Sequence, residues 1–387
     1  MKPASGRRPG TRRNWHPRRY RALALMAAAV TGSTLLAGCF SGSGPSAAGL
    51  TPVTVMVTPG VANAPLFLGW GRGIFRAAGI RLVVQDQPAQ VTQKGQPPQS
   101  SLAWTAKQEV SALDSGSADI AFSDYADMFA ADDPARGGQR SRDIQVVADG
   151  YDCGPNVVEV LALPGSGITN PKQLMGAKVA VPAPDELPAK SQGAPVPFSQ
   201  DMLFTWSALE GDNVNPARVH WVPVDPTQPP GLAGAISPRQ NPNNPNNPLP
   251  PVAQAIVAEQ PDISNVETTD GAVPVLDACA SENATNGMPL DGYFTSSVFA
   301  RTHAALLGRF RSALAKAQAA AAASPSGIDG VLRNADNIQS AISALVTVGT
   351  YPTTLDAQSL QRVASLMTSL SALPQQPPFS AGSLIAR

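Results

Sequence analysis

The stretch TVMVTPGVANAPLFLGWGRGIFRAAGIRLVV, residues 54–84, contains one complete strand–helix–strand unit. It opens with the largely β-branched run 54–57, which a Pro-Gly pair closes. Residues 65–78 then carry apolar side chains at helical spacing, and after a glycine the run 80–84 is again almost wholly apolar. Such runs are typical of strands buried on both faces of a parallel sheet. The unit therefore predicts an α/β fold.

The same alternation continues along the chain. We expect further strands at 118–122, 144–148, 157–163, 178–181 and 219–222, and helices at 109–115, 125–131, 171–175, 198–209, 304–323, 328–348 and 356–370. Residues 252–258 indicate a short helix that runs into a strand. The Pro- and Asn-rich segment 223–251 has a composition that does not form packed structure. The pattern predicts lobes with mainly parallel sheets flanked by helices.

The N-terminal segment has the parts of an export signal. Lys2 and seven arginines, with no acid among them, precede the uncharged stretch 22–36. The residues LAGC at 36–39 follow and resemble the bacterial lipoprotein box. The resemblance implies a signal peptide over 1–38 and an acylated Cys39. The small, polar residues that follow indicate a flexible tether over 39–51. The apolar stretch is too short to span a bilayer permanently. The alternative is an ordinary secreted protein with a small-residue cleavage site.

Removal of this signal changes the charge of the chain. The whole sequence has 28 basic and 28 acidic residues, but residues 1–38 hold eight of the basic ones and none of the acids. The mature chain has 20 basic and 28 acidic residues, a net charge of about −8. No cationic surface remains to displace counterions, which argues against nucleic acid as a partner. The remaining length of about 350 residues suits two domains.

The chain has three cysteines. With Cys39 acylated, Cys153 and Cys279 remain in an oxidising compartment, where two leftover thiols most often pair. We expect a disulfide between them. The alternative is two separate buried thiols.

Four stretches occur in a fixed order behind the signal. They are NAPLF at 63–67 with GIFRAAGI at 73–80, ALDSGSADIA at 112–121, ITNPKQLMGAKVAV at 168–181, and residues 293–301 followed by 304–323. Together they resemble the periplasmic-type substrate-binding proteins of the nitrate, sulfonate, taurine and thiamine-precursor group. The resemblance covers about residues 52–324. Met175 and Ala177, where lysines are usual, and the 223–251 insertion depart from it.

The resemblance implies the type II periplasmic-binding-protein fold, an α/β fold of two lobes with a cleft between them. Residues 52–151 and 291–387 would form one lobe, and residues 152–290 the other. Two crossing segments would join the lobes. Loops at the carboxyl ends of parallel strands, together with helix N-termini, would line the cleft.

Seven residues in these loops are candidates for ligand binding: Asn63, Ala64, Ser123, Asp124, Asp152, Ala183 and Glu259. Asn63, Ser123 and Asp124 also stand just before helices, so helix capping explains them as well. The acids among the seven suggest a polar or cationic ligand, because a small oxyanion is better held by arginines and bare N–H groups. Three aromatic residues suit stacking on a flat ligand or core packing, and packing is favoured: Phe204, Trp206 and Trp221.

Other kinds of site find no support. His220 and His303 are the histidines that remain after removal of the signal, they lie far apart in sequence, and no cysteine cluster replaces them. The chain has no Gly-x-Ser-x-Gly elbow, Walker loop or dinucleotide fingerprint. We therefore expect no metal, no cofactor and no catalytic residues.

These observations favour a monomeric solute-binding protein, lipid-anchored on the extracytoplasmic face of the cell membrane. It would close on a small molecule and pass it to the permease and ATPase of an ABC importer. One alternative is an extracytoplasmic enzyme on the same lobes, which a titratable cluster in the cleft would favour. Another is a ligand sensor or adhesion lipoprotein without an importer. The ligand itself is left open.

Overall fold

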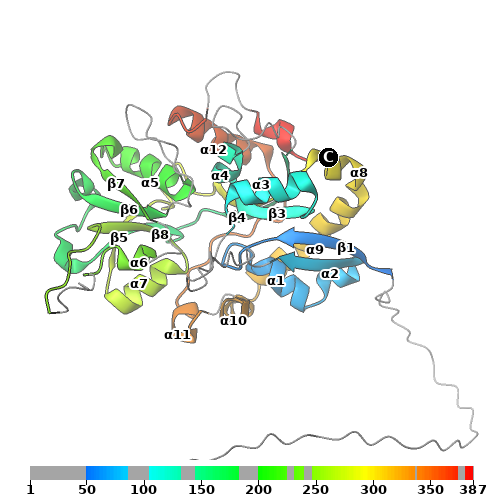
Figure 1. Ribbon diagram of the computed structural model, residues 1–387, viewed down its shortest axis with the longest axis horizontal. Coiled ribbons are helices and arrows are strands. Elements are labelled where there is room, and N and C mark those ends of the chain that lie inside the picture. The colour runs from blue at the N-terminus through cyan, green and yellow to red at the C-terminus, as the bar shows by residue number, and fades with distance from the viewer. Residues whose placement is uncertain are drawn as a thin grey trace, which may run out of the picture. The chain divides into compact units, whose positions relative to one another are not determined.

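The computed structural model describes residues 49–85, 104–131, 144–182, 199–224, 231–238, 246–335, 338–373 and 380–386. Cys39, the signal peptide and Ala183 lie outside these residues. The described elements form two five-stranded sheets, each flanked by helices (Figure 1). We name each sheet with its helices a lobe. The exact residues proposed from the sequence as lobe boundaries stay a prediction.

Lobe 1 contains a sheet in the order β2-β1-β3-β10-β4. Its strands are β1 (Thr51–Met56), β2 (Ile80–Gln85), β3 (Ile120–Asp124), β4 (Ile144–Asp152) and β10 (Pro289–Ser296). The helices that precede β10 in sequence are α1 (Ala64–Gly71), α2 (Ile74–Ala77), α3 (Ala106–Ser115) and α4 (Tyr125–Ala131). Those that follow are α8 (Ser297–Thr302), α9 (Ala304–Ala322), α10 (Pro325–Ala335), α11 (Ser340–Ser343), α12 (Ala357–Ser369) and the 3-10 turn η6 (Ala381–Leu384).

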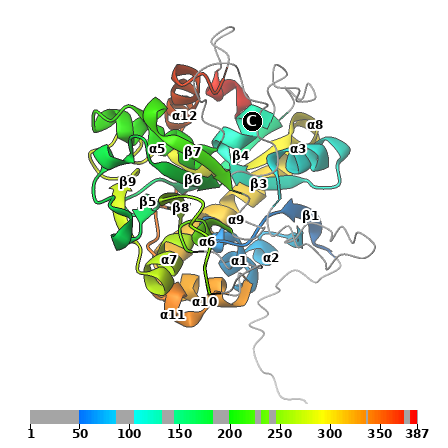
Figure 2. The same ribbon diagram turned by 60° about the vertical axis from the view of Figure 1, so that its left-hand side comes forward.

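Lobe 2 contains a sheet in the order β7-β6-β8-β5-β9. Its strands are β5 (Val158–Ala162), β6 (Lys178–Pro182), β7 (His220–Val224), β8 (Ala255–Glu259) and β9 (Val273–Asp277). The helices are α5 (Gln200–Gly211), α6 (Gly231–Gly234) and α7 (Asp262–Asp270), with 3-10 turns η3 (Pro164–Ser166), η4 (Pro171–Leu174) and η5 (Pro216–Arg218). Helix α5 covers one face of this sheet, and α6 and α7 cover the other (Figures 1 and 2).

Both sheets are mixed, whereas the sequence suggested mainly parallel ones. Strand β1 runs parallel to β2 and β3, but β10 runs antiparallel to β3 and β4. In lobe 2, β6 is parallel to β7 and β8, but β5 is antiparallel to β8 and β9. The reason is topological, because β5 and β10 are the strands by which the chain enters a lobe from the other one. They run away from the crossing, and strands such as β3 and β8 run toward it.

Three expected elements differ in the structure. The helix expected over 65–78 is divided into α1 and α2, because Gly73 adopts a left-handed φ of 72° that a continuous helix does not allow. The helix expected over 328–348 is replaced by the shorter α10 and α11. Residues 252–258 contain no helix, only the start of β8.

The Pro- and Asn-rich segment is the other correction. The turn α6 lies inside it and places Leu232, Ala235 and Ile236 in a buried cluster with Ile256 of β8 and Val266 of α7. On β8 the intervening Ala255 and Val257 face the other, larger core. The alternation shows why β8 is apolar throughout, since both of its faces are buried.

The two crossing segments are joined covalently. A disulfide links Cys153, which follows β4, to Cys279, which follows β9, with their Cα atoms 5.4 Å apart. The backbone N–H of Cys153 donates to the Met288 carbonyl over 2.8 Å, and the Gly287 N–H donates to the Cys153 carbonyl over 2.8 Å. Both crossings are therefore tied to one another where the chain passes between the lobes.

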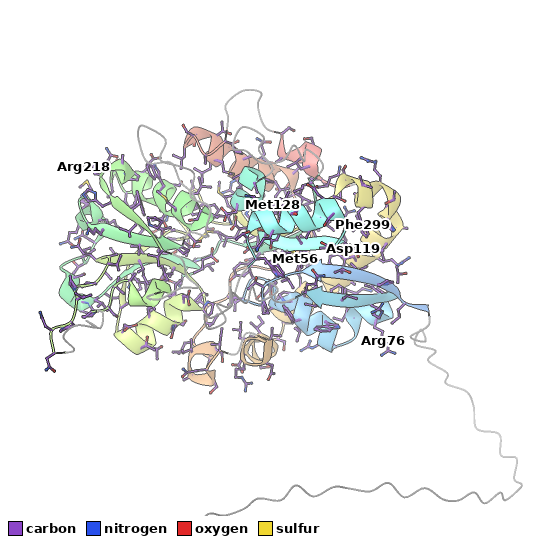
Figure 3. All side chains as sticks on the ribbon, in the orientation of Figure 1. Met56, Arg76, Asp119, Met128, Arg218 and Phe299 are labelled. Carbon is purple, nitrogen blue, oxygen red and sulfur yellow. A yellow bond between two sulfur atoms is a disulfide. The ribbon has the colours of Figure 1, made fainter. Side chains whose placement is uncertain are left out.

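Buried and exposed side chains occur in both lobes. Met56 of β1 and Met128 of α4 are buried, whereas Arg76 of lobe 1 and Arg218 of lobe 2 lie at the surface (Figure 3). Among the described residues, no helix has both the length and the apolar character needed to span a membrane.

Candidate functional site

Acidic side chains from both lobes meet beside the crossing segments. Asp124 ends β3, and its register partner Asp291 lies near the start of β10. Glu259 ends β8, and Asp201 lies in the first turn of α5. We call these four residues the interlobe acid cluster. Each of them keeps some exposed surface, so a bound molecule could reach them.

Gln200 holds the two lobes together at this cluster. Its Oε1 accepts from the Ala126 backbone N–H over 2.9 Å, and its Nε2 donates to the Leu290 carbonyl. Ala126 belongs to α4 of lobe 1, and Leu290 to β10. Because Gln200 precedes Asp201 directly, these two bonds fix Asp201 beside the carboxyl groups of lobe 1.

The carboxyl groups of the cluster shift one another's pKa values. Loss of surrounding water raises the pKa of Asp124 well above its ordinary value, and the charge of Asp291 raises it further. The pKa of Glu259 is raised by the same loss of water and by the charge of Asp201. Asp201 and Glu259 share a side-chain hydrogen bond. Burial, then the charges of Asp201 and Asp127, raise the pKa of Asp291 to about 7.

Glu109 of α3 lies near the cluster, on the lobe 1 side. Its side chain is 3% exposed, and its carboxyl group accepts a hydrogen bond from Ser123. The Oε2 atom of Glu109 is buried with no hydrogen-bond partner. Burial raises the pKa of Glu109 well above its ordinary value, and the charges of Asp127 and Asp291 add to this effect. Ser123 therefore positions a carboxyl group within reach of Asp291.

The structure brings some of the sequence-predicted residues together. Asp124 and Glu259 lie close enough for the charge of Asp124 to raise the pKa of Glu259. Asp124 also accepts from the Asp127 N–H over 2.6 Å, which is the capping role considered as its alternative. A ligand contact by any of the predicted residues stays a proposal.

Other predicted residues are not members of the cluster. The amide of Asn63 is engaged within its own loop, since Oδ1 accepts from the Gly60 N–H over 3.1 Å and Nδ2 donates to the Thr58 carbonyl over 2.6 Å. Ala64 is fully buried at the start of α1. Asp152 ends β4 with an unpartnered, buried Oδ1, and loss of water raises its pKa to about 7.

The three aromatic candidates pack within lobe 2. Trp206 and Trp221 stack with their ring centres 6.2 Å apart, and Phe204 is fully buried. The indole N–H of Trp206 donates to Glu210 over 3.1 Å, and that of Trp221 donates to the Pro216 carbonyl over 3.1 Å. Their arrangement agrees with the packing alternative.

The sequence reasoning missed Gln200, Asp201, Asp291 and Glu109. Asp291 lies just before the stretch 293–301 that carried the resemblance, and Asp201 looks like an ordinary acid in a first helical turn. The signal that existed was the acidity of the strand-end loops. That signal indicated a charged site but not its full membership.

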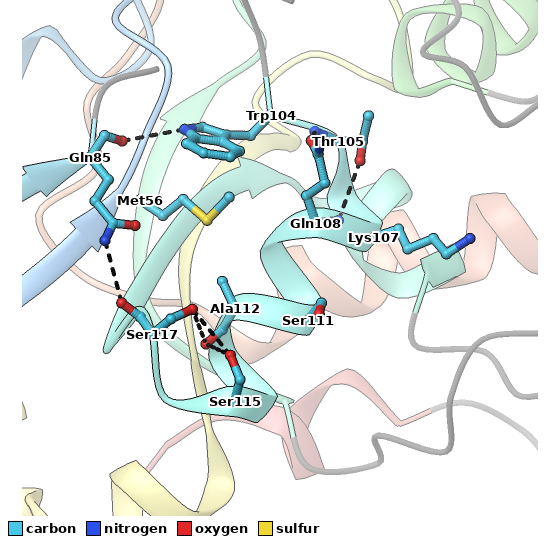
Figure 4. Close-up of a pocket in the computed structure, with 10 residues that line it drawn as sticks. All are labelled: Met56, Gln85, Trp104, Thr105, Lys107, Gln108, Ser111, Ala112, Ser115 and Ser117. Atoms are coloured by element: carbon cyan, nitrogen blue, oxygen red, sulfur yellow. Dashed lines mark hydrogen bonds between the residues drawn. The ribbon is translucent and has the colours of Figure 1, made fainter. Parts of the chain in front are cut away.

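A separate pocket of about 540 Å³ lies beside α3 (Figure 4). Met56, Gln85, Trp104 and Ser111 are among its lining residues, and Gln85 accepts from the Trp104 indole N–H over 3.3 Å through its backbone carbonyl. All of its described lining belongs to lobe 1. A ligand there would contact one lobe, so it could not by itself favour closure of two lobes.

The described residues contain no group of three or more His, Cys, Asp or Glu side chains arranged to hold a metal ion. The interlobe acid cluster therefore brings carboxyl groups from two lobes close together without the geometry of a metal site. Its oxygens can accept hydrogen bonds from a molecule held between the lobes.

Comparison with solved structures identifies the fold. The structure is similar to the periplasmic aliphatic sulphonate-binding protein SsuA of Escherichia coli, with a TM-score of 0.60 and 15% identity over 87% of this chain and 97% of that one. The chain has the periplasmic-binding-protein fold. The periplasmic nitrate-binding protein NrtA of Synechocystis shares it, with a TM-score of 0.56 and 11% identity over 87% of this chain and 85% of that one.

An enzyme shares the fold as well. The desulfurization enzyme DszB is similar with a TM-score of 0.54 and 18% identity, over 87% of this chain and 96% of that one. No protein-family model matches the sequence, and no curated protein does. These likenesses establish the fold, and the function has to be argued from the site.

Proposed function

We propose that this protein is a lipid-anchored extracytoplasmic solute-binding protein that captures a small polar molecule by closure of its lobes. It would deliver the molecule to the permease and ATPase of an ABC importer. Cys39 would carry the anchor, and the folded part would act as a monomer. The SsuA and NrtA likenesses support this role through the shared fold.

One observation carries the proposal. Polar side chains from both lobes meet beside the crossing segments. Gln200 of lobe 2 is hydrogen-bonded to two residues of lobe 1, Ala126 of α4 and Leu290 of β10. A molecule bound at this place would contact both lobes. Such a ligand stabilises the closed arrangement of the lobes because it binds that arrangement more tightly than the open one.

An enzyme on the same fold is the second candidate, and the shared hydrogen bond between Asp201 and Glu259 favours it. Acid–base catalysis works best when the surroundings move two pKa values apart. Here the pKa values of Asp124, Asp201, Glu259 and Asp291 are all raised. Cys153 and Cys279 are joined in a disulfide, so neither offers a thiol nucleophile. The cluster therefore suits binding better than turnover.

A thermal-shift screen against small polar metabolites tests the proposal. A ligand at 100 times its Kd adds about 2.7 kcal/mol to the stability of the folded protein. We expect Asp124→Ala and Asn63→Ala to weaken binding of the best compound by about 1–3 kcal/mol. Asp124 would lose a direct contact, and Asn63 would lose the bonds that hold the loop at Thr58 and Gly60.

The control is Asp329→Ala, because Asp329 pairs with Arg333 on α10 and lies outside the cluster. The compound should also be recovered chemically unchanged after binding. Conversion of the compound to a product would support the enzyme. Unchanged affinity in both the Asp124 and Asn63 variants would place the site elsewhere.

A further inference from the structure

The interlobe acid cluster is tightly constrained by backbone and side-chain bonds. Asp124 and Asp291 are opposite one another on the antiparallel strands β3 and β10. The two bonds of Gln200 hold Asp201 next to them, and Asp201 is hydrogen-bonded to Glu259. The strand register and the bonds of Gln200 thus hold Asp124, Asp291 and Asp201 close together without depending on their charge. The bond between Asp201 and Glu259 requires one of these two carboxyl groups to be protonated.

A second, independent feature lies beside the cluster. Glu109 is nearly fully buried, and its Oε2 atom has no hydrogen-bond partner. Ser123 holds the other side of this carboxyl group, and Asp291 lies close enough to disturb its ionisation. A buried acceptor without a donor is rare in native proteins and calls for a partner. A donor that enters beside Asp291 would supply it.

Other carboxyl groups are the main charged neighbours of these acids. They are the charged groups with the largest influence on Asp124, Glu259, Asp291 and Glu109. By contrast, the neighbouring Asp152 feels the positive charge of Arg362. Among the described residues, the cluster therefore gathers acids with no positive charge among their main electrostatic influences.

The missing positive charge is better supplied by an organic cation than by a metal ion. No described group of acids has the geometry of a metal site. An ammonium group carries three donors and forms charge-assisted hydrogen bonds to carboxylates, which are the stronger kind. Nitrate and sulfonate groups would meet repulsion from the same carboxylates.

We propose that the solute is a small organic cation whose ammonium group is held between Asp124 and Asp291 of lobe 1 and Asp201 and Glu259 of lobe 2. This inference rests on the proposed solute-binding function. The ligand would bridge the lobes because its positive charge would neutralise acids of lobe 1 and of lobe 2. Closure of the lobes would therefore accompany this neutralisation.

The test uses the full chain, purified in detergent, and three ammonium probes with matched uncharged partners. The probes are 3,3-dimethylbutan-1-amine with 3,3-dimethylbutan-1-ol, ethanolamine with ethylene glycol, and 1,4-diaminobutane with 1,4-butanediol. Nitrate and propane-1-sulfonate serve as anions. We expect at least one ammonium probe to raise Tm, with a larger shift at pH 8 than at pH 5, since the carboxyl groups must be ionised. Its uncharged partner should give no shift.

Variants connect the binding to the cluster. Glu259→Gln in lobe 2 and Asp124→Asn in lobe 1 should each weaken the binding of that probe by about 10- to 100-fold. Asp201→Asn provides a further lobe 2 variant if Glu259→Gln does not fold. The matched control is Glu282→Gln, an exposed acid of lobe 2, which should leave the affinity unchanged.

Two results would overturn the inference and differ in what else they overturn. Binding of nitrate, sulfonate or an uncharged probe, without binding of any ammonium probe, would refute the cation but keep solute binding. No shift with the ammonium probes up to about 10 mM would also refute the cation. If the wider metabolite screen gave no ligand either, the proposed function would fail with it.

Discussion

Removal of the disulfide by Cys153→Ala with Cys279→Ala is expected to lower the free energy of unfolding by about 5 kcal/mol. The two cysteines are 126 residues apart, and closing a loop of this length restricts the unfolded chain by about that amount in the chain-entropy treatment. Both side chains are buried, so the change would also loosen the packing between the crossing segments.

Equilibrium unfolding in urea, with and without a reducing agent, measures this effect. The reducing agent should destabilise the wild-type protein and leave the double variant unchanged. The variant and the reduced wild-type protein should then unfold at similar urea concentrations. Equal stability of the oxidised wild-type protein and the variant would show that the bond contributes nothing to the fold.

The second large effect concerns pH. Asp291 has a pKa of about 7 in the folded protein, against an ordinary value of 3.8. An acid whose pKa is raised on folding contributes stability fully at low pH, and the contribution is lost as the pH rises through the folded-state pKa. The shift corresponds to about 4 kcal/mol, lost between about pH 4 and pH 7. Asp152 and Glu159, each with a pKa of about 7, act in the same direction.

Urea unfolding of the ligand-free protein at pH 5 and pH 8 tests this expectation. The wild-type protein should be less stable at pH 8, and Asp291→Asn should reduce the difference. Glu282→Gln, which changes an exposed acid, should behave like the wild-type protein. A wild-type protein that gains stability from pH 5 to pH 8 would contradict the account of the acid cluster.

The sequence predicted the general fold but not the direction of every strand. Apolar runs such as 179–181 marked strands well, because a strand buried on both faces needs apolar side chains at every position. The antiparallel course of β5 and β10 could not be read from those runs, since side-chain pattern is the same in either direction. The buried turn α6 was missed because Leu232 and Ile236 are few among many prolines and asparagines.

The site was predicted only in part for a similar reason. Asp124 and Glu259 could be proposed because each follows a recognisable strand. Gln200 lies 74 residues from Ala126 and 90 from Leu290 in sequence, so no local pattern shows that it joins them. The positions of Asp201 and Asp291 depend on those long-range bonds. The unpartnered atom of Glu109 is likewise a property of the packed structure alone.

The central claim is that one solute contacts both lobes and closes them. The most direct measurement places spin labels on Arg76→Cys in lobe 1 and Arg218→Cys in lobe 2, two surface positions, and records their distance with and without the most stabilising compound (Figure 3). The account predicts that saturating compound moves the distances into one narrower, shorter distribution, and that Glu259→Gln abolishes this change at the same concentration. An identical distribution with and without bound compound would contradict it.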